Sequence, residues 1–334
     1  MARIAPKPTM IETRTRIDQI PTKQLTERRT TNDNLFGTSH LGIPEVIADD
    51  WQLEFTGLID KPATLSFGQL RALEKIELES AYVCAGNPDK PELAMRRAAN
   101  VVWGGVALAP LLAEMGVQNA ASHLWAYGLD YGAFKGETVD HYLKDIPLGR
   151  VAGGDVLLAY ELNGAPLSAK NGFPARLVVP GYYGTNSVKW LCRLQLANGR
   201  PDHHFTELYS DPDYAADPSG KVTKPVWDVS PESLIIAPAA KDEIPLAPTE
   251  IWGWAWSNCA AQSVEVSVDG GATWQAADLE NPQGRAWQKF IYPWTPPKPG
   301  TYDLRCRTTD IKGETQPEAD WRNSIYSAVI SVTE

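Results

Sequence analysis

The chain has 334 residues, more than one compact core usually needs, and its 43% hydrophobic and 22% charged content is typical of a folded, soluble protein. A formal net charge of -10, with only short basic pieces, argues against nucleic acid or an anionic membrane as a partner. The sequence contains no run of about 18 apolar residues and no secretory signal at its start, so we expect a cytoplasmic protein as written, or a periplasmic one if a leader was removed.

The first predicted elements mix strands with helices. Residues 1–33 are polar without a clear period, and we expect an extended N-terminal arm. The alternation over residues 51–59 predicts a strand, and Ser66 stands at the N-cap of a short helix that follows. A second helix is predicted over residues 106–117, ended by Gly116.

Strands continue the pattern further along the chain. Residues 155–167 form two apolar stretches around an Asn163-Gly164 pair, which predicts a hairpin. Residues 175–184 place an apolar strand directly before a loop bounded by glycines. Together these elements predict an α+β domain over residues 34–227.

The pattern changes near residue 228. Helix signals stop, and strand-like stretches follow at the spacing of a sandwich, with Asp269-Gly270-Gly271 as a hairpin turn. Residues 228–334 are therefore predicted to form an all-β, immunoglobulin-like sandwich. Because tryptophan contributes strongly to packing wherever it is buried, we expect core and interface anchors, rather than a binding cage, at Trp252, Trp254, Trp256, Trp274, Trp287 and Trp294.

Cys84 is the most informative cysteine, because Ala, Gly and Asn follow it directly. The four cysteines include no CxxC pair and no CxxCH motif, so we expect no haem in this chain. On base rates Cys84 is a small buried hydrophobe. It could also be a nucleophile with His40 or His141 as its base, or a metal ligand. A single thiolate cannot hold a bare metal ion, so a cofactor would have to supply most ligands, and spacing alone leaves this choice open.

A second candidate site is the loop that Gly181 and Gly184 bracket. Its hydroxyl, amide and ammonium donors suit a phosphate or a polar heterocycle. The spacing is not that of a P-loop, and a surface turn between strands is an equally good interpretation of the segment alone. The donor side chains are Thr185, Asn186, Ser187 and Lys189.

Three segments together resemble the molybdopterin enzymes of the sulfite oxidase family, in the family's order and spacing. They are CAGN at 84–87, DVLLAYELNGAPL with NGFPARLVVPGYYGTNSVKWL over 155–191, and GWAWS with VEVSVDGGATWQ over 253–275. The resemblance runs from about residue 34 to the C-terminus. It implies a sulfite-oxidase-type molybdopterin domain, an immunoglobulin-like dimerisation domain, a molybdenum-molybdopterin cofactor and a homodimer.

The same resemblance implies roles for individual residues. Cys84 falls on the cysteine whose thiolate binds molybdenum beside the two dithiolene sulfurs of the pterin, and a soft sulfur ligand suits such a metal. Tyr142 matches the active-site tyrosine that reaches the substrate, and Trp103 matches a pocket tryptophan. The residues expected to bind the cofactor are His40, Arg176, Asn186, Ser187 and Lys189.

The chain departs from the family where sulfite is usually bound. Thr38 and Asp89 stand where the family has arginines, and a carboxylate about 4 Å from an anion would cost on the order of 4 kcal/mol. These differences resemble the sulfane dehydrogenase branch of the family. Candidate replacement cations are Lys90, Arg96, Arg97 and Arg285.

The resemblance therefore implies a molybdenum oxidoreductase, sulfite dehydrogenase-like, that oxidises a small sulfur compound. Since no haem motif is present, electrons would pass to a separate cytochrome c-type acceptor, and the acidic chain would favour a basic one. One alternative is sulfane oxidation or another oxo transfer on the same cofactor. The other is a non-catalytic scaffold protein.

Overall fold

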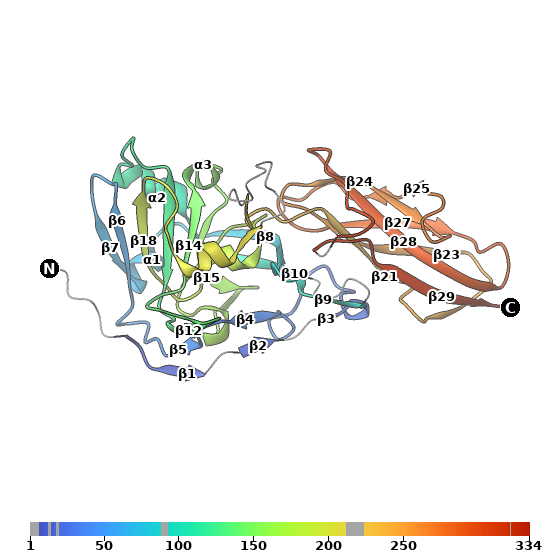
Figure 1. Ribbon diagram of the computed structural model, residues 1–334, viewed down its shortest axis with the longest axis horizontal. Helices are drawn as coiled ribbons and strands as arrows, with labels where there is room; N and C mark the ends of the chain where they lie inside the picture. Colours follow the sequence, from blue (N-terminus) through green and yellow to red (C-terminus); the bar gives the residue numbers. More distant parts are fainter. Residues whose placement is uncertain (1–6, 13–14, 18–19, 88–92, 212–223, 321) are drawn as a thin grey trace.

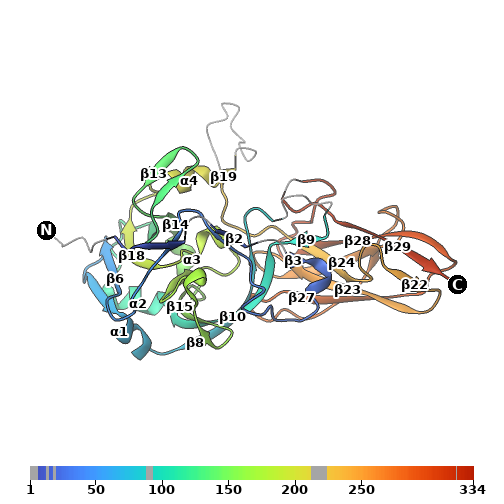
Figure 2. The same cartoon turned by 90° about the horizontal axis from the view of Figure 1, so that it is seen from below.

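The computed structural model describes residues 7–12, 15–17, 20–87, 93–211, 224–320 and 322–334. Two domains lie side by side along the long axis of the molecule, and the C-terminus lies at the far end of the strand-only domain (Figure 1). The view from below shows the N-terminal arm running along the first domain toward the second (Figure 2). Among the described helices, none is long and apolar enough to cross a membrane.

The first domain combines two sheets with short helices. One sheet is antiparallel except for its β18–β6 pair and has the order β14 (Leu143–Pro147), β11 (His123–Gly128), β18 (Leu191–Ala197), β6 (Gln52–Gly57) and β7 (Ala63–Ser66). The other is antiparallel, with the order β16 (Ala165–Pro166), β15 (Leu157–Leu162), β10 (Ala98–Ala107) and β8 (Ile76–Val83), and β17 (Arg176–Val178) also pairs with β15.

Short helices and hairpins connect these strands. The helices are α1 (Phe67–Ala72), α2 (Leu108–Met115), α3 (Leu148–Val151) and α4 (His204–Leu208), with 3-10 turns η2 (Ala169–Asn171) and η3 (Gly184–Asn186). Two short strand pairs accompany them: β12 (Gly132–Phe134) with β13 (Glu137–Val139), and β19 (Ser210–Asp211) with β20 (Lys224–Pro225). This mixture confirms the α+β prediction for the first domain.

Local signals in the sequence explain where several elements begin and end. The Ser66 side chain accepts a hydrogen bond from the Gln69 backbone N–H and the Gln69 side chain accepts one from Ser66 N–H, a complete capping box for α1. Gly116, at φ +75°, ends α2 as predicted. Asn163 and Gly164 both have positive φ, at 50° and 77°, as a tight hairpin between β15 and β16 requires.

The N-terminal arm is built into both domains. Its strands β1 (Met10–Glu12), β2 (Thr15–Ile17) and β3 (Ile20–Pro21) pair with β5 (Ile43–Pro44), β4 (Gly37–Ser39) and β9 (Met95–Arg96). The 3-10 turn η1 (Thr22–Gln24) then lies against the second domain, where Trp254 Nε1 donates a 2.7 Å hydrogen bond to the Leu25 carbonyl. The described parts of the arm thus contact both domains.

The second domain is the predicted β-sandwich. One sheet has the order β21 (Glu232–Ala237), β23 (Thr249–Trp256), β27 (Gln288–Trp294) and β26 (Asp278–Leu279). The other has the order β22 (Glu243–Pro245), β29 (Ser327–Thr333), β28 (Gly300–Asp310), β24 (Ala261–Ser267) and β25 (Gln275–Ala276).

Five of the six tryptophans named from the sequence belong to or pack against the sandwich core, whereas Trp274 is only partly buried and lies outside that cluster. Trp254 stacks on Trp287 with ring centroids 4.9 Å apart, and both rings are buried. Trp256 and Trp294 are buried in the same apolar cluster, and Trp252 packs against it. These rings therefore act as core anchors.

Candidate active site

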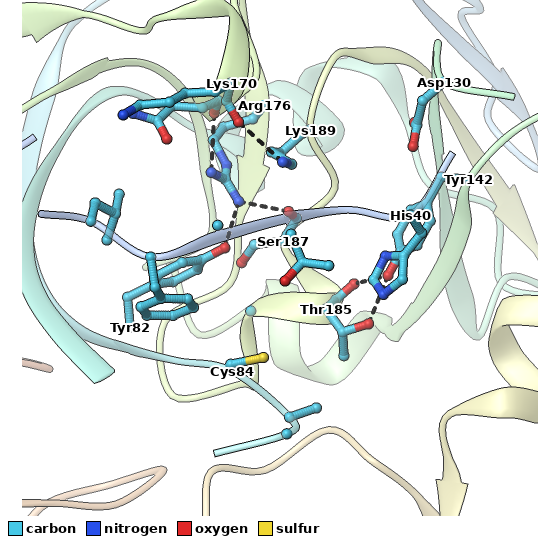
Figure 3. A pocket seen from close by; sticks show the side chains of 18 of the residues that line it. His40, Tyr82, Cys84, Asp130, Tyr142, Lys170, Arg176, Thr185, Ser187 and Lys189 are labelled. Atoms are coloured by element: carbon cyan, nitrogen blue, oxygen red, sulfur yellow. Dashed lines mark hydrogen bonds between the residues drawn. The ribbon is translucent and has the colours of Figure 1, made fainter. Parts of the chain in front are cut away.

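A cavity lies where several loops of the first domain converge (Figure 3). Cys84 follows β8 directly, Tyr142 precedes β14, and Arg176 begins β17. The turns η2 and η3 supply Lys170 and Thr185. In the view of Figure 3, the Cys84 sulfur lies at one end of the cavity and the cationic side chains lie at the other.

The cavity gathers most of the predicted site residues. Of the eight, six line it: Cys84, Tyr142, His40, Arg176, Ser187 and Lys189. Residues that are far apart in the sequence thus meet at one place, which spacing alone could not establish.

Trp103 and Asn186 lie behind the cavity wall. Trp103 is fully buried in β10, its ring packs edge-on to Tyr82, and the Arg176 guanidinium lies 4.9 Å from its centroid. Asn186 is fully buried and donates 3.0 Å hydrogen bonds to the carbonyls of Tyr183 and Val226. Both positions support residues of the wall, and their predicted roles in substrate or cofactor contact stay predictions.

Arg176 is held rigidly at the cationic end of the cavity. Its Nη2 donates to the Tyr82 hydroxyl at 2.9 Å and to the Ser187 carbonyl at 2.8 Å, while Nη1 donates to the Asn171 carbonyl at 3.1 Å. Its Nε is buried without a hydrogen-bond partner. Gly184 permits this arrangement, because an added Cβ would lie 2.8 Å from the Tyr82 ring.

The half-buried Lys189 and the buried Asp130 are two further ionisable residues of the cavity lining. Lys189 Nζ donates to Ser39 Oγ at 3.2 Å and to the Lys170 carbonyl at 3.1 Å. Burial lowers the pKa of Lys189, and the neighbouring Arg176 lowers it further. Burial raises the pKa of Asp130, whose Oδ1 has no hydrogen-bond partner. Buried polar atoms without a partner, such as Asp130 Oδ1 and Arg176 Nε, fit a polar ligand that would complete their hydrogen bonds.

Sequence reasoning did not identify Asp130 as a site residue. The available signal was a carboxylate two residues after the end of strand β11, next to apolar residues, where an unpaired charge is costly. It also missed Tyr82, Lys170 and Tyr209, which line the cavity but belong to no segment that was assigned a role.

Tyr142 and His40 form the side of the cavity nearest Thr185. The Tyr142 hydroxyl lies 2.7 Å from both the carbonyl oxygen and Oγ1 of Thr185. Burial raises the pKa of Tyr142 well above its ordinary value, so the hydroxyl stays protonated. The His40 ring stacks on Tyr142 at 5.9 Å, and its Nε2 lies 2.8 Å from the Tyr209 hydroxyl.

Cys84 is half-buried and its sulfur faces the cavity (Figure 3). Its backbone N–H donates to the Arg97 carbonyl at 2.9 Å, and its own carbonyl accepts from Asn87 N–H at 3.1 Å, closing a tight turn. Within the described ranges, no group of three His, Cys, Asp or Glu side chains could hold a metal ion. A metal at Cys84 would therefore need a cofactor that brings its own ligands.

The arginines considered as replacement cations do not line the cavity. Arg96 and Arg97 are buried rather than solvated, and Arg96 Nε pairs with Glu232 at 2.9 Å. Arg285 Nε pairs with Asp155 at 2.8 Å. Asp89 and Lys90 lie outside the described residues. Thr38 does line the cavity, and the cations there are Lys170, Arg176 and Lys189.

Comparisons with known proteins agree with this architecture. Residues 40–205 match the family described as an oxidoreductase molybdopterin binding domain, and residues 223–329 match the Mo-co oxidoreductase dimerisation domain. The fold and the cavity thus define a molybdopterin-dependent oxidoreductase.

Individual relatives narrow the assignment. Sulfite oxidase of Gallus gallus is 30% identical over 334 residues, an alignment that covers 90% of this chain and 70% of that protein. Mitochondrial sulfite oxidase of Homo sapiens is 30% identical over 329 residues, covering 89% of this chain and 59% of that protein. The chain belongs to the sulfite oxidase family.

A solved structure shares the whole fold. The sulfane dehydrogenase SoxCD from Paracoccus pantotrophus matches with a TM-score of 0.79 and 24% identity, over 100% of this chain and 95% of that chain. Both domains of the present structure therefore occur together, in the same arrangement, in a known protein.

Proposed function

We propose that the protein is a sulfite dehydrogenase-like enzyme that oxidises a small sulfur compound and passes the electrons to a separate cytochrome. Its family membership makes it a molybdenum-cofactor oxidoreductase. The observation that carries the finer assignment is the meeting of Cys84, Tyr142 and a cationic cluster in one cavity.

The residues present fit molybdopterin. Lys170, Arg176 and Lys189 offer cationic donors suited to a phosphate, and the unpartnered Asp130 Oδ1 can accept from a pterin N–H. The Cys84 thiolate is a soft ligand suited to molybdenum. When bound, the cofactor supplies the two-electron redox chemistry and the transferable oxygen atom.

The chain's own groups would bind and orient the substrate. Burial keeps the Tyr142 hydroxyl protonated, and its one proton donates to the Thr185 carbonyl at 2.7 Å in this structure. Rotation of the O–H bond would let the same proton point to a substrate oxygen on which charge develops. His40 packs against the Tyr142 ring and fixes its plane. The ring itself is already in place, so only the hydroxyl hydrogen has to turn.

A sulfane-type sulfur compound is the second candidate substrate. Thr38 supplies no charge where the family's sulfite enzymes have arginine, so sulfite itself would be bound weakly. The similarity of this fold to a sulfane dehydrogenase is consistent with a substrate other than sulfite. A millimolar or weaker KM for sulfite, together with faster turnover of a sulfane substrate, would favour this candidate.

Two partners belong to the proposal. The match to a dimerisation domain supports a homodimer. A basic cytochrome c-type acceptor suits the net charge of -10. Stopped-flow reduction of cytochrome c should then slow as ionic strength rises, and a rate independent of salt would argue against an electrostatically guided acceptor.

Metal analysis of the purified protein tests the function most directly. We expect about one molybdenum per chain, the metal for which the cavity residues supply a thiolate ligand, and sulfite-dependent reduction of ferricyanide. Holoprotein with molybdenum but without sulfite turnover would leave the second candidate. Correctly folded protein without molybdenum would instead support a non-catalytic scaffold.

A further inference from the structure

The turn that carries Cys84 rests on the sandwich domain. We call residues 84–87 the cysteine loop. Val83 and Ala85, the neighbours of Cys84 on both sides, are 1% and 6% exposed and belong to the same apolar cluster as Trp254 and Trp287 of the sandwich. The backbone on either side of the sulfur-bearing residue is therefore packed into the core of the other domain.

A buried arginine of the sandwich domain binds the loop backbone. Arg322 Nη1 donates a 2.7 Å hydrogen bond to the Ala85 carbonyl, one residue after Cys84. The Arg322 side chain is 7% exposed, and its guanidinium lies 5.1 Å from the Tyr183 ring centroid. This contact fixes the peptide plane between Ala85 and Gly86, the second one after Cys84.

A buried carboxylate of the sandwich domain holds the other end of the loop. Glu232, at the start of β21, accepts from Asn87 Nδ2 at 3.1 Å with one oxygen and from Arg96 Nε at 2.9 Å with the other. Asn87 is 1% exposed, and its Oδ1 accepts from Arg97 N–H at 2.6 Å. The Asn87 side chain therefore has its position set from both domains.

Buried charges at such a place need a reason beyond holding the domains together. Burying Glu232 and Arg322 costs desolvation energy, and well-packed apolar residues would join the domains at least as well. What the two charges add is direction, because each ends on a defined polar atom of the cysteine loop. Directional contacts of this kind orient metal ligands.

We propose that Glu232 and Arg322 are positioning residues for the Cys84 sulfur, so that the sandwich domain shapes the metal site in addition to any role in dimerisation. This inference rests on the proposed function, in which Cys84 binds molybdenum. The orientation of a thiolate controls its overlap with the metal, and loss of outer contacts of metal ligands typically costs about 10- to 100-fold in affinity or activity.

Four variants of the holoprotein test the proposal. Glu232→Gln leaves one acceptor oxygen where two donors converge, and Arg322→Met removes the bond to Ala85 while keeping an unbranched side chain. Arg322→Lys keeps a donor and serves as the conservative rescue. The matched control is Glu265→Gln, which neutralises the 2.8 Å pair with Arg307 on the sandwich surface.

The deciding readouts do not depend on the substrate. They are molybdenum per chain, the electron paramagnetic resonance g-values and midpoint potential of the one-electron-reduced metal, and the thermal unfolding temperature. We expect shifted g-values or lost molybdenum in Glu232→Gln and Arg322→Met, with partial recovery in Arg322→Lys and none of these changes in Glu265→Gln. Where sulfite is turned over, kcat should fall about 10- to 100-fold with little change in KM.

The possible outcomes separate this inference from the proposed function. Wild-type protein without molybdenum would overturn the proposed function and this inference with it. Molybdenum-loaded Glu232→Gln and Arg322→Met with wild-type g-values would overturn this inference alone. If Glu232→Gln does not fold, the two variants Arg322→Met and Arg322→Lys decide the question by the same criteria. If Arg322→Met also fails to fold, the contacts serve the fold and the proposal is rejected.

Discussion

The interior of the sandwich and the wall of the cavity are built from opposite kinds of side chain. The sandwich buries stacked tryptophans and aliphatic residues around Trp254 and Trp287. The cavity wall buries Arg176 and Asp130 and half-buries Lys189, and the charges of such groups are costly to remove from water. This difference indicates that burying charged groups in the cavity wall lowers the stability of the first domain, where a ligand would bind. The apolar core of the sandwich raises stability.

The largest effect should follow from changing the cavity at its sulfur. For Cys84→Ser we expect turnover to fall by about a thousandfold or more, roughly 4 kcal/mol in the barrier, with an unchanged unfolding temperature. Steady-state kinetics and thermal melting measure both. The control is Cys259→Ser in the sandwich, where a hydroxyl can replace the thiol beside Ser257. Wild-type turnover in Cys84→Ser would remove this residue from the metal site.

A tryptophan-to-alanine substitution tests the packing of the sandwich interior. The Trp287 side chain is completely buried, with 0% solvent exposure. Trp287→Ala should therefore lower the free energy of unfolding by about 3–5 kcal/mol. Trp274, which is only partly buried and lies under Arg307 at 4.3 Å, provides the control, with a loss of about 1 kcal/mol for Trp274→Ala. Urea denaturation gives both values, and equal losses would contradict the assignment of Trp287 to the core.

A buried lysine away from the cavity wall sharpens the comparison through pH. Lys144 is 1% exposed, its Nζ donates to the Phe205 carbonyl at 3.2 Å, and burial lowers its pKa to about 7. The unfolded chain keeps this proton up to about pH 10.5, so the cost of burying the charge is full below pH 7 and disappears as pH rises toward 10.5.

Lys144→Met should therefore be more stable than the wild type near pH 7, by an amount on the order of a few kcal/mol. The difference should shrink as pH rises toward 10. Urea denaturation of both proteins at several pH values measures it. A difference that is constant between pH 7 and pH 10 would show that Lys144 does not titrate in this range.

The smallest expected effect concerns one hydroxyl of the cavity. Tyr142→Phe keeps the ring that stacks on His40 but removes the donor beside Thr185. We expect kcat/KM to fall about 10- to 100-fold, shared between substrate affinity and the transfer rate. Tyr127→Phe, which removes a hydroxyl that donates to Gln195 in β18, is the control. Kinetics identical to the wild type would withdraw the role of Tyr142.

The sequence allowed much of the fold to be predicted, because its signals are local. Ser66 with its partner Gln69, Gly116 and the Asn163-Gly164 pair each act within a few residues, and all appear in the structure as expected. The sandwich was predictable from strand spacing and turn residues. The cavity-lining positions of Cys84 and Tyr142 followed from resemblance to a family, not from periodicity.

Other features could not be predicted, because they depend on contacts between distant segments. Asp130 reaches the cavity only because β11 ends beside Lys189, and Tyr209 reaches it only because α4 returns to His40. Arg96 and Arg97 were candidate replacement cations for the cavity, yet Arg96 is fully buried against Glu232, 136 positions further along the chain.

By itself, the sequence determined the elements of this protein, its family and the identity of a cysteine suited to molybdenum, since motifs and capping signals are written in neighbouring residues. Only the tertiary structure decided which charged side chains share a cavity with that cysteine and that a second domain contacts its loop. The physical reason is that burial and hydrogen-bond partners depend on the three-dimensional arrangement of the chain. Arg322 and Glu232 reach Ala85 and Asn87 of the cysteine loop only after the chain has folded.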